Sequence, residues 1–172
     1  RNIIMKYIDL TGKWRMQKVG GTKSYTATIP GSVAATLLSN RKIPDPYFAD
    51  NEAKVLPVFD DDYVFRRDFE VDEGILTHDK VLLHCDGLDT LAEITLNGKR
   101  VATTDNMHRS YAFDIKDSLR LGENEIEIIF RSPTHYVREN PSKAGKPFST
   151  LRKAACMFGW DWGPNLPDSG IW

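Results

Sequence analysis

Hydrophobic and polar residues alternate along much of the chain, and this pattern predicts β-strands. Residues 63–71 show it clearly, because Tyr63, Phe65, Phe69 and Val71 fall on one face and charged residues fall on the other. Successive side chains of a strand point to opposite faces, so the pattern is typical of a half-buried antiparallel strand. Similar patterns predict strands over residues 13–18, 24–29, 80–86, 92–96, 99–102, 111–115 and 126–130.

Two short segments that contain glycine predict turns between these strands. Asn97-Gly98 separates two alternating runs, and both residue types tolerate the positive φ angles of a type I′ turn, so a hairpin is expected there. Gly122-Glu123-Asn124 precedes another alternating run and predicts a second turn.

The remaining segments predict one short helix and two long loops. Ser32 suits a helix N-cap, and residues 33–38 continue the helix for two turns. Residues 40–62 and 132–150 each hold three prolines and are expected to be long surface loops. About eight short strands separated by turns predict an all-β, two-sheet jelly-roll sandwich with one short helix and long loops.

Length and charge exclude several classes of protein. The 172 residues suit one domain with a sizeable core but are too few for a (β/α)₈ barrel, which takes ~250 residues. The net charge of −1, with both signs interspersed, gives no reason to expect nucleic acid or a membrane as a partner. No apolar run approaches the ~18 residues of a membrane span. A soluble protein is expected, and since the chain begins at Arg1, export after removal of a signal peptide stays open.

The sequence contains no recognisable metal or cofactor motif, and neither is expected. The four histidines lack the spacing of a zinc site. The run Asp60-Asp61-Asp62 lacks the spaced carboxylates and the turn glycine of a calcium loop, so we interpret it as a solvated turn. Cys85 and Cys156 are expected to be free thiols. There is no phosphate-binding loop, no nucleophile elbow and no spacing that singles out a pair of carboxylates.

One segment near the C-terminus combines groups that could bind a sugar. Trp160 and Trp162 flank Asp161, and Gly159 and Gly163 bracket the triplet. If the triplet is extended, both indoles project to one side and the carboxylate to the other. Indoles suit the C–H face of a sugar, and a carboxylate can accept hydrogen bonds from two neighbouring hydroxyls. The residues alone leave two interpretations open: a sugar site, or tryptophans packed in the core with Asp161 capping a turn.

A series of short motifs runs in order along nearly the whole chain and ends with this segment. They are Pro30–Val33, Ile43–Tyr47, Asp50–Glu52, Tyr63–Phe69, Gly87–Thr90, Leu96–Gly98, Asp105–Met107, Arg152-Lys153, Phe158–Pro164 and Gly170–Trp172. In this order, ending with Trp-Asp-Trp-Gly-Pro, they resemble the N-terminal domain of β-mannosidases of glycoside hydrolase family 2. One departure is His108, at a position where the family more often has an aromatic residue such as phenylalanine.

The resemblance implies a galactose-binding-domain-like jelly roll over residues 1–172, cut at Trp172 before its last strand. In the complete enzyme, immunoglobulin-like and (β/α)₈-barrel domains would follow. Such enzymes remove terminal β-linked mannose with retention, using two glutamates of the barrel. Because the length excludes that barrel, no residue of this chain is expected to be catalytic, and the chain alone is expected to be inactive. Its implied partners are a β-mannoside glycan, bound by the complete enzyme, and the barrel itself.

The resemblance also implies a role for the triplet as one wall of the −1 sugar pocket. Asp161 would accept hydrogen bonds from the sugar, while Trp160 and Trp162 would shape the wall or hold the loop. Arg152 and Lys153 either orient Asp161 through a salt bridge or are solvated surface cations. The alternative functions are the equivalent domain of an exo-β-glucosaminidase, β-galactosidase or β-glucuronidase, and an independent carbohydrate-binding module.

Overall fold

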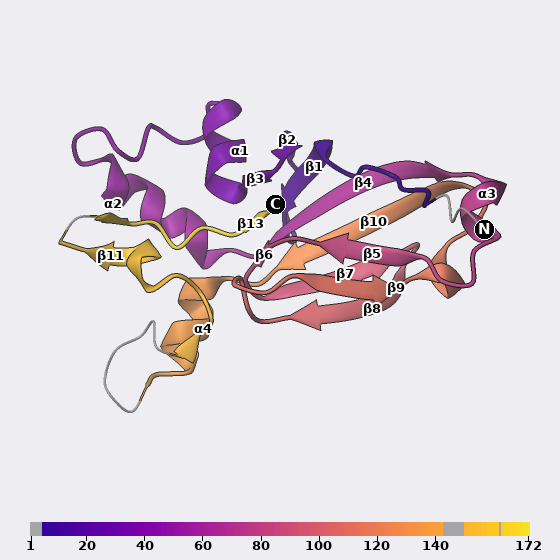
Figure 1. The fold of residues 1–172 in the computed structure, drawn as a ribbon. Coiled ribbons are helices and arrows are strands. Elements are labelled where there is room, and N and C mark those ends of the chain that lie inside the picture. The colour runs from indigo at the N-terminus through magenta and orange to yellow at the C-terminus, as the bar shows by residue number, and fades with distance from the viewer. Residues whose placement is uncertain (1–4, 143–149, 162) are drawn as a thin grey trace.

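A six-stranded antiparallel sheet forms the larger layer of the protein, seen in a computed structural model that describes residues 5–142, 150–161 and 163–172 (Figure 1). Its strand order is β2-β1-β4-β10-β7-β8. The strands are β1 (Gly12–Lys18), β2 (Ser24–Ile29), β4 (Tyr63–Val71), β7 (Ala92–Leu96), β8 (Lys99–Thr104) and β10 (Gly122–Phe130).

Shorter strands complete the fold. A two-stranded sheet of β5 (Leu82–Cys85) and β9 (Tyr111–Asp114) lies against the larger layer (Figure 1). A three-stranded sheet has the order β3-β13-β6, and β11 pairs with β12 in a hairpin. Their bounds are β3 (Gly31–Ser32), β6 (Leu88–Asp89), β11 (Phe158–Trp160), β12 (Gly163–Asn165) and β13 (Gly170–Ile171).

The apolar faces of these strands form one continuous core. Phe65 of β4 and Phe130 of β10 are almost fully buried, and their rings meet edge to face at a centroid distance of 5.8 Å. From the smaller layer, Leu83 and Cys85 contribute alternate positions of β5, while His84 between them points to solvent. This alternation confirms the predicted sandwich, because each layer buries one apolar face against the other.

The two predicted turns had different outcomes. Asn97 and Gly98 both have positive φ angles, 52° and 77°, and connect β7 to β8, as predicted. The turn predicted at residues 122–124 is wrong, because these residues begin β10. Asn124 is fully buried there, and its side-chain oxygen accepts hydrogen bonds from the side chain of Asn97 (2.8 Å) and the backbone of Arg120 (3.0 Å). A polar residue that suits a turn instead stabilises the neighbouring turns from inside a strand.

Helices are more numerous than the single one predicted. The predicted helix is α1 (Val33–Ser39), capped by the Ser32 hydroxyl, which accepts from the Ala35 N–H at 3.2 Å. The other helices of the described residues are α2 (Asn51–Val55), α3 (Glu73–Leu76), α4 (Pro133–Glu139) and the 3₁₀ turns η1 (Leu56–Asp60), η2 (Lys116–Ser118) and η4 (Ala155–Met157). No helix of the described residues is long and apolar enough to cross a membrane.

The two segments predicted as long surface loops pack on each other. Val55 and Phe59 of the first segment and Val137 of the second are buried, although none belongs to the core between the sheets. The Phe59 carbonyl accepts hydrogen bonds from the Ser132 and Thr134 hydroxyls at 2.6 and 2.8 Å. The helices α1, α2 and α4 and the β11 hairpin gather beyond one end of the large sheet, and α3 lies at the other (Figure 1). The prolines thus mark short helices and turns that cover one end of the sandwich.

Candidate functional site

The hairpin formed by β11 and β12 carries the tryptophan-rich triplet. Trp160 pairs with Gly163 at the end of the ladder, and Asp161 follows in a turn. Asp161 therefore does not continue the strand, so the extended conformation considered for the triplet is not formed. The Trp160 side chain is 52% exposed, so this indole does not pack in the core. Trp162 lies outside the described residues.

Asp161 stands at the tip of the hairpin. It is exposed, and no described residue donates a hydrogen bond to its carboxylate or pairs with it. As far as the described residues are concerned, both carboxylate oxygens thus remain available as acceptors. An exposed indole beside an exposed carboxylate can offer an apolar plate and two acceptors to a polyhydroxylated ligand.

The base of the hairpin is held by short contacts to neighbouring elements. The Asn165 N–H donates to the Glu52 carboxylate of α2 at 3.0 Å, and the Leu166 N–H donates to the Met157 carbonyl at 2.9 Å. Gly159 has a φ of +88°, and a Cβ atom there would lie 3.3 Å from the Asn165 Cβ. This left-handed angle and the close approach explain why glycine occurs at this position.

The segment before the hairpin is attached to the loop around Met107. The Met107 N–H donates to the Arg152 carbonyl at 3.0 Å, and the Ala154 N–H approaches the Met107 sulfur at 3.0 Å. Asn106 and Arg152 also form an isolated parallel bridge. The segment that leads into the hairpin is therefore hydrogen-bonded to the loop around Met107.

Neither prediction for Lys153 is correct. Its side chain is fully buried, and the ammonium group lies 2.6 Å from Asp89 of β6, so it neither pairs with Asp161 nor faces solvent. Arg152 is exposed and makes no ion pair with any described carboxylate. Of the two alternatives considered for this pair of cations, the salt bridge to Asp161 is thus not formed among the described residues, and the solvated surface position applies to Arg152 alone.

Lys153 belongs to a buried polar cluster that joins four segments. Besides Asp89, its ammonium donates to the Asp168 carbonyl. The other oxygen of Asp89 accepts from the Thr90 hydroxyl. The Asp168 carboxylate accepts from the backbone N–H of Ala34, at 3.0 and 3.2 Å, and from that of Ser169 at 2.8 Å.

Burial sets the direction of the pKa shifts in this cluster. It lowers the pKa of the Lys153 ammonium, and the negative charge of Asp89 partly offsets that effect. Burial likewise raises the pKa of Asp168, against the hydrogen bonds from Ser32, Ala34 and Ser169. Both shifts follow from the cost of holding a charge away from water. Sequence reasoning missed Asp89 and Asp168, because nothing in their local pattern distinguishes them from surface carboxylates.

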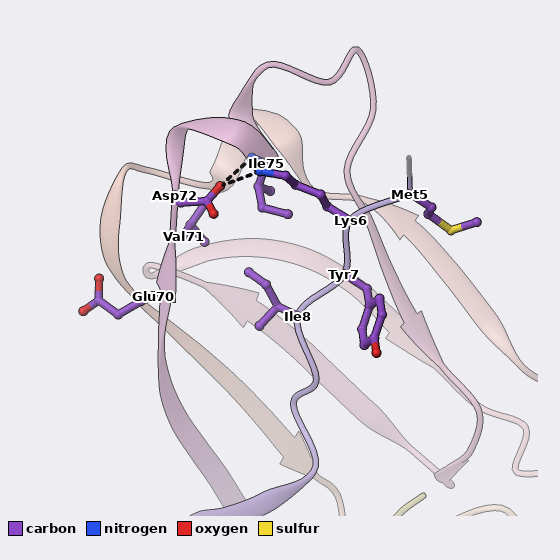
Figure 2. Close-up of a pocket in the computed structure, with 8 residues that line it drawn as sticks. All are labelled: Met5, Lys6, Tyr7, Ile8, Glu70, Val71, Asp72 and Ile75. Carbon is purple, nitrogen blue, oxygen red and sulfur yellow. Dashed lines mark hydrogen bonds and ion pairs between the residues drawn. The ribbon is translucent and has the colours of Figure 1, made fainter. Parts of the chain in front are cut away.

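Two cavities formed by described residues lie away from Asp161. One, of about 450 Å³, is at the far end of the sandwich, where Lys6 reaches towards Asp72 at 3.8 Å beside Ile8 and Ile75 (Figure 2). That ion pair is largely exposed and so contributes little to stability. A second cavity, of about 340 Å³, is lined by residues of β3, β6 and β13, by Asp168 and by two methionines. Neither cavity is lined by Trp160 or Asp161.

The other candidate groups have structural partners. Asp61 pairs with Lys18 at 2.8 Å, Asp62 pairs with Arg131 at 2.9 Å, and Asp60 pairs with Arg138. The three carboxylates of this run therefore point to separate cations. Both cysteines are free thiols, as predicted.

The chain is similar in sequence and in fold to known proteins. A family model described as "Glycosyl hydrolase 2 galactose-binding domain-like" matches residues 14–172. The chain belongs to this family. As a galactose-binding-like domain of glycosyl hydrolase family 2, it has the all-β jelly-roll class predicted from the sequence.

Several relatives of this domain are β-mannosidases. It is 34% identical to the β-mannosidase of Bos taurus over 96% of the chain, which is 20% of that protein. A crystal structure of a β-D-mannosidase from Dictyoglomus thermophilum matches with a TM-score of 0.93 and 39% identity, covering 98% of this chain and 22% of that one. An exo-chitosanase from Amycolatopsis orientalis matches with a TM-score of 0.61 and 22% identity, over 70% of this chain and 16% of that one, and shows the shared fold alone. The domain thus spans about a fifth of the length of the curated relatives it matches.

Proposed function

We propose that this domain is the N-terminal part of a retaining exo-β-mannosidase and that it forms one wall of the site for the terminal mannose. Support comes from β-mannosidase relatives that match almost all of the chain at 31–34% identity in four mammals. Because those relatives are about five times longer, the catalytic glutamates would lie outside these residues, in a (β/α)₈ barrel that follows an immunoglobulin-like domain.

The exposed carboxylate of Asp161 is the single observation that supports the role of the hairpin. It stands at a hairpin tip above a firmly bonded base, with Trp160 exposed beside it. A carboxylate whose two oxygens have no partner among the described residues can accept hydrogen bonds from neighbouring hydroxyls of one sugar ring, and charge strengthens such bonds. Trp160 would supply an apolar surface next to that ring, and Trp162 keeps the role predicted for it from the sequence.

The domain would complete a pocket rather than bind sugar alone. Ligand sites enclose most of the surface of a small ligand, whereas Trp160 and Asp161 line neither of the two cavities described above, which are formed by described residues. An independent carbohydrate-binding module would need such an enclosure or an extended platform of its own. We therefore favour the pocket-completing role over the lectin-like one.

A β-mannoside is the substrate class that the comparisons favour. Identity to the Dictyoglomus thermophilum β-D-mannosidase is 39%, against 22% to the exo-chitosanase and 16% to a β-D-glucuronidase from Dictyoglomus thermophilum. Assays of the complete enzyme on aryl β-mannoside, β-glucosaminide, β-galactoside and β-glucuronide test this choice. We expect cleavage of the mannoside by the complete enzyme and no cleavage by the 172-residue chain; preference for another sugar would contradict the proposed specificity.

Replacement of Asp161 tests the role of the hairpin. In the complete enzyme, Asp161→Ala should lower kcat/KM on an aryl β-mannoside by about 100-fold or more, roughly 3 kcal/mol, because the sugar loses a charged acceptor. The exposed Asp79, just beyond α3 at the other end of the sandwich, gives the control Asp79→Ala, which should behave as wild type. A folded Asp161→Ala enzyme with unchanged kcat/KM would remove Asp161 from the proposed site.

A further inference from the structure

The two ends of the segment that carries the hairpin meet at one side chain. Lys153 precedes β11 and Asp168 follows β12, and the Lys153 ammonium donates to the backbone carbonyl of Asp168. The same ammonium lies 2.6 Å from the carboxylate of Asp89, a residue of β6. One cation therefore closes the base of the segment and attaches it to the sandwich.

Both anchors of this cation are themselves held in place. Asp89 is buried, and its second oxygen accepts from the Thr90 hydroxyl. The Asp168 carboxylate accepts the backbone N–H groups of Ala34 and Ser169, which connects the base to the start of α1. Because hydrogen bonds depend on direction as well as distance, this chain of contacts defines one position for the base.

The ammonium group of Lys153 is buried, whereas lysine side chains are rarely fully buried unless they are paired. The Lys153 side chain has no exposed surface and that of Asp89 has 5%. Removing such a pair from water has a high energetic cost, and apolar side chains of similar volume often stabilise a fold as well or better. A buried pair at the base of a functional segment therefore suggests a role in geometry rather than in stability alone.

We propose that Lys153 is a positioning residue, whose bonds to Asp89 and to the Asp168 carbonyl hold the hairpin so that Asp161 stands at the sugar. This inference rests on the proposed function of Asp161. Asp161 has no described partner of its own, so the backbone beneath it determines where its carboxylate lies. A small displacement of a binding group is enough to reduce catalysis strongly.

Lys153→Met in the complete enzyme tests the proposal, because methionine keeps an unbranched apolar chain and removes the donors. We expect kcat/KM on an aryl β-mannoside to fall by about 10- to 100-fold, as for a misplaced group. Arg66→Met is the matched control. It removes another cation from a 2.6 Å ion pair, with Glu127, on the opposite face of the large sheet from the core, and it should leave kcat/KM unchanged.

A double-mutant cycle separates positioning from general support of the fold. If Lys153 acts through Asp161, then Lys153→Met should change kcat/KM by less than about threefold in the Asp161→Ala background, since the group it positions is gone. Equal losses in both backgrounds would overturn the proposal and assign Lys153 a structural role only.

The remaining outcomes are also distinct. Wild-type kcat/KM in Lys153→Met, with a loss in Asp161→Ala, would overturn the positioning role and leave the proposed function intact. No loss in Asp161→Ala would contradict the proposed function itself.

If Lys153→Met does not fold, Asp89→Asn replaces it, because asparagine keeps the shape and one acceptor oxygen. We expect a smaller loss of about three- to tenfold for Asp89→Asn, which should also disappear in the Asp161→Ala background.

Discussion

The sandwich and the end that carries the hairpin are held together by different forces. Between the sheets, apolar side chains such as Phe65 and Phe130 pack in a continuous core. At the hairpin end, the segment that carries the hairpin is held by polar contacts that include the buried Lys153–Asp89 pair and the bond from Asn165 to Glu52. Burial of apolar surface stabilises a fold but does not depend on the direction of the contact, whereas hydrogen bonds and ion pairs also determine how groups are oriented. The comparison suggests that the sandwich supplies stability and the hairpin end supplies geometry.

The largest effect expected on stability comes from the sandwich. Phe65→Ala should lower the free energy of unfolding of the 172-residue chain by about 3–5 kcal/mol, because it opens a cavity in a core with no exposed Phe65 surface. Urea denaturation followed by circular dichroism measures this loss. Phe48→Ala is the matched control, and with its side chain 71% exposed it should change stability by less than about 0.5 kcal/mol. Equal losses of unfolding free energy in the two variants would mean that packing in the core is not the main source of stability.

An intermediate effect is expected at the hairpin. Gly159→Ala should destabilise the chain by about 1–2 kcal/mol, since alanine is strained at a φ of +88° and its Cβ would press on Asn165. The same denaturation experiment applies. Gly20 has a φ of +76° with nothing within 4 Å, so Gly20→Ala should show the backbone strain without the contact. If Gly20→Ala lowers the free energy of unfolding as much as Gly159→Ala does, the close approach to Asn165 does not contribute to the loss.

The smallest effect is expected from the two thiols, one in each region. Burial raises the pKa of the Cys85 thiol to about 11, so it stays protonated and unreactive at pH 8. Iodoacetamide at pH 8 should therefore label Cys156, which is partly exposed, in the native chain and Cys85 only after denaturation, as read by mass spectrometry. Reductant should leave the melting temperature unchanged because both thiols are free. Native labelling of Cys85 would show that the sandwich opens at that point.

Strand positions were largely predictable, because burial of one face imposes a period of two on the sequence. Residues 63–71 form β4 as predicted. Asn97-Gly98 forms the predicted hairpin turn, which connects β7 to β8. Asn124 was assigned to a turn because its residue type favours turns, yet it occupies a buried strand position that depends on partners distant in sequence. The helices in the two long segments were missed for a related reason, since prolines mark the ends of short helices as well as loops.

The residue types of the candidate site could be predicted from the sequence, but the contacts that hold the hairpin in place could not. Asp161 and the tryptophans could be found because a carboxylate between two indoles is an unusual local arrangement. Lys153 was read as a possible partner of Asp161, being close in sequence and opposite in charge. Its actual partner, Asp89, lies 64 residues away in the chain.

The sequence by itself determined the strands, the apolar faces that form the sandwich and the family to which the chain belongs. These depend on periodic patterns and on the order of short motifs, both of which can be read locally. Only the tertiary structure decided that Asp161 stands at a hairpin tip, that Lys153 forms a buried pair at the base rather than either of the two arrangements considered for it, and which carboxylate holds it. Such pairings arise when β6, α1 and the hairpin segment meet in space, and a charge in the sequence does not reveal which of its many possible partners the fold will bring close.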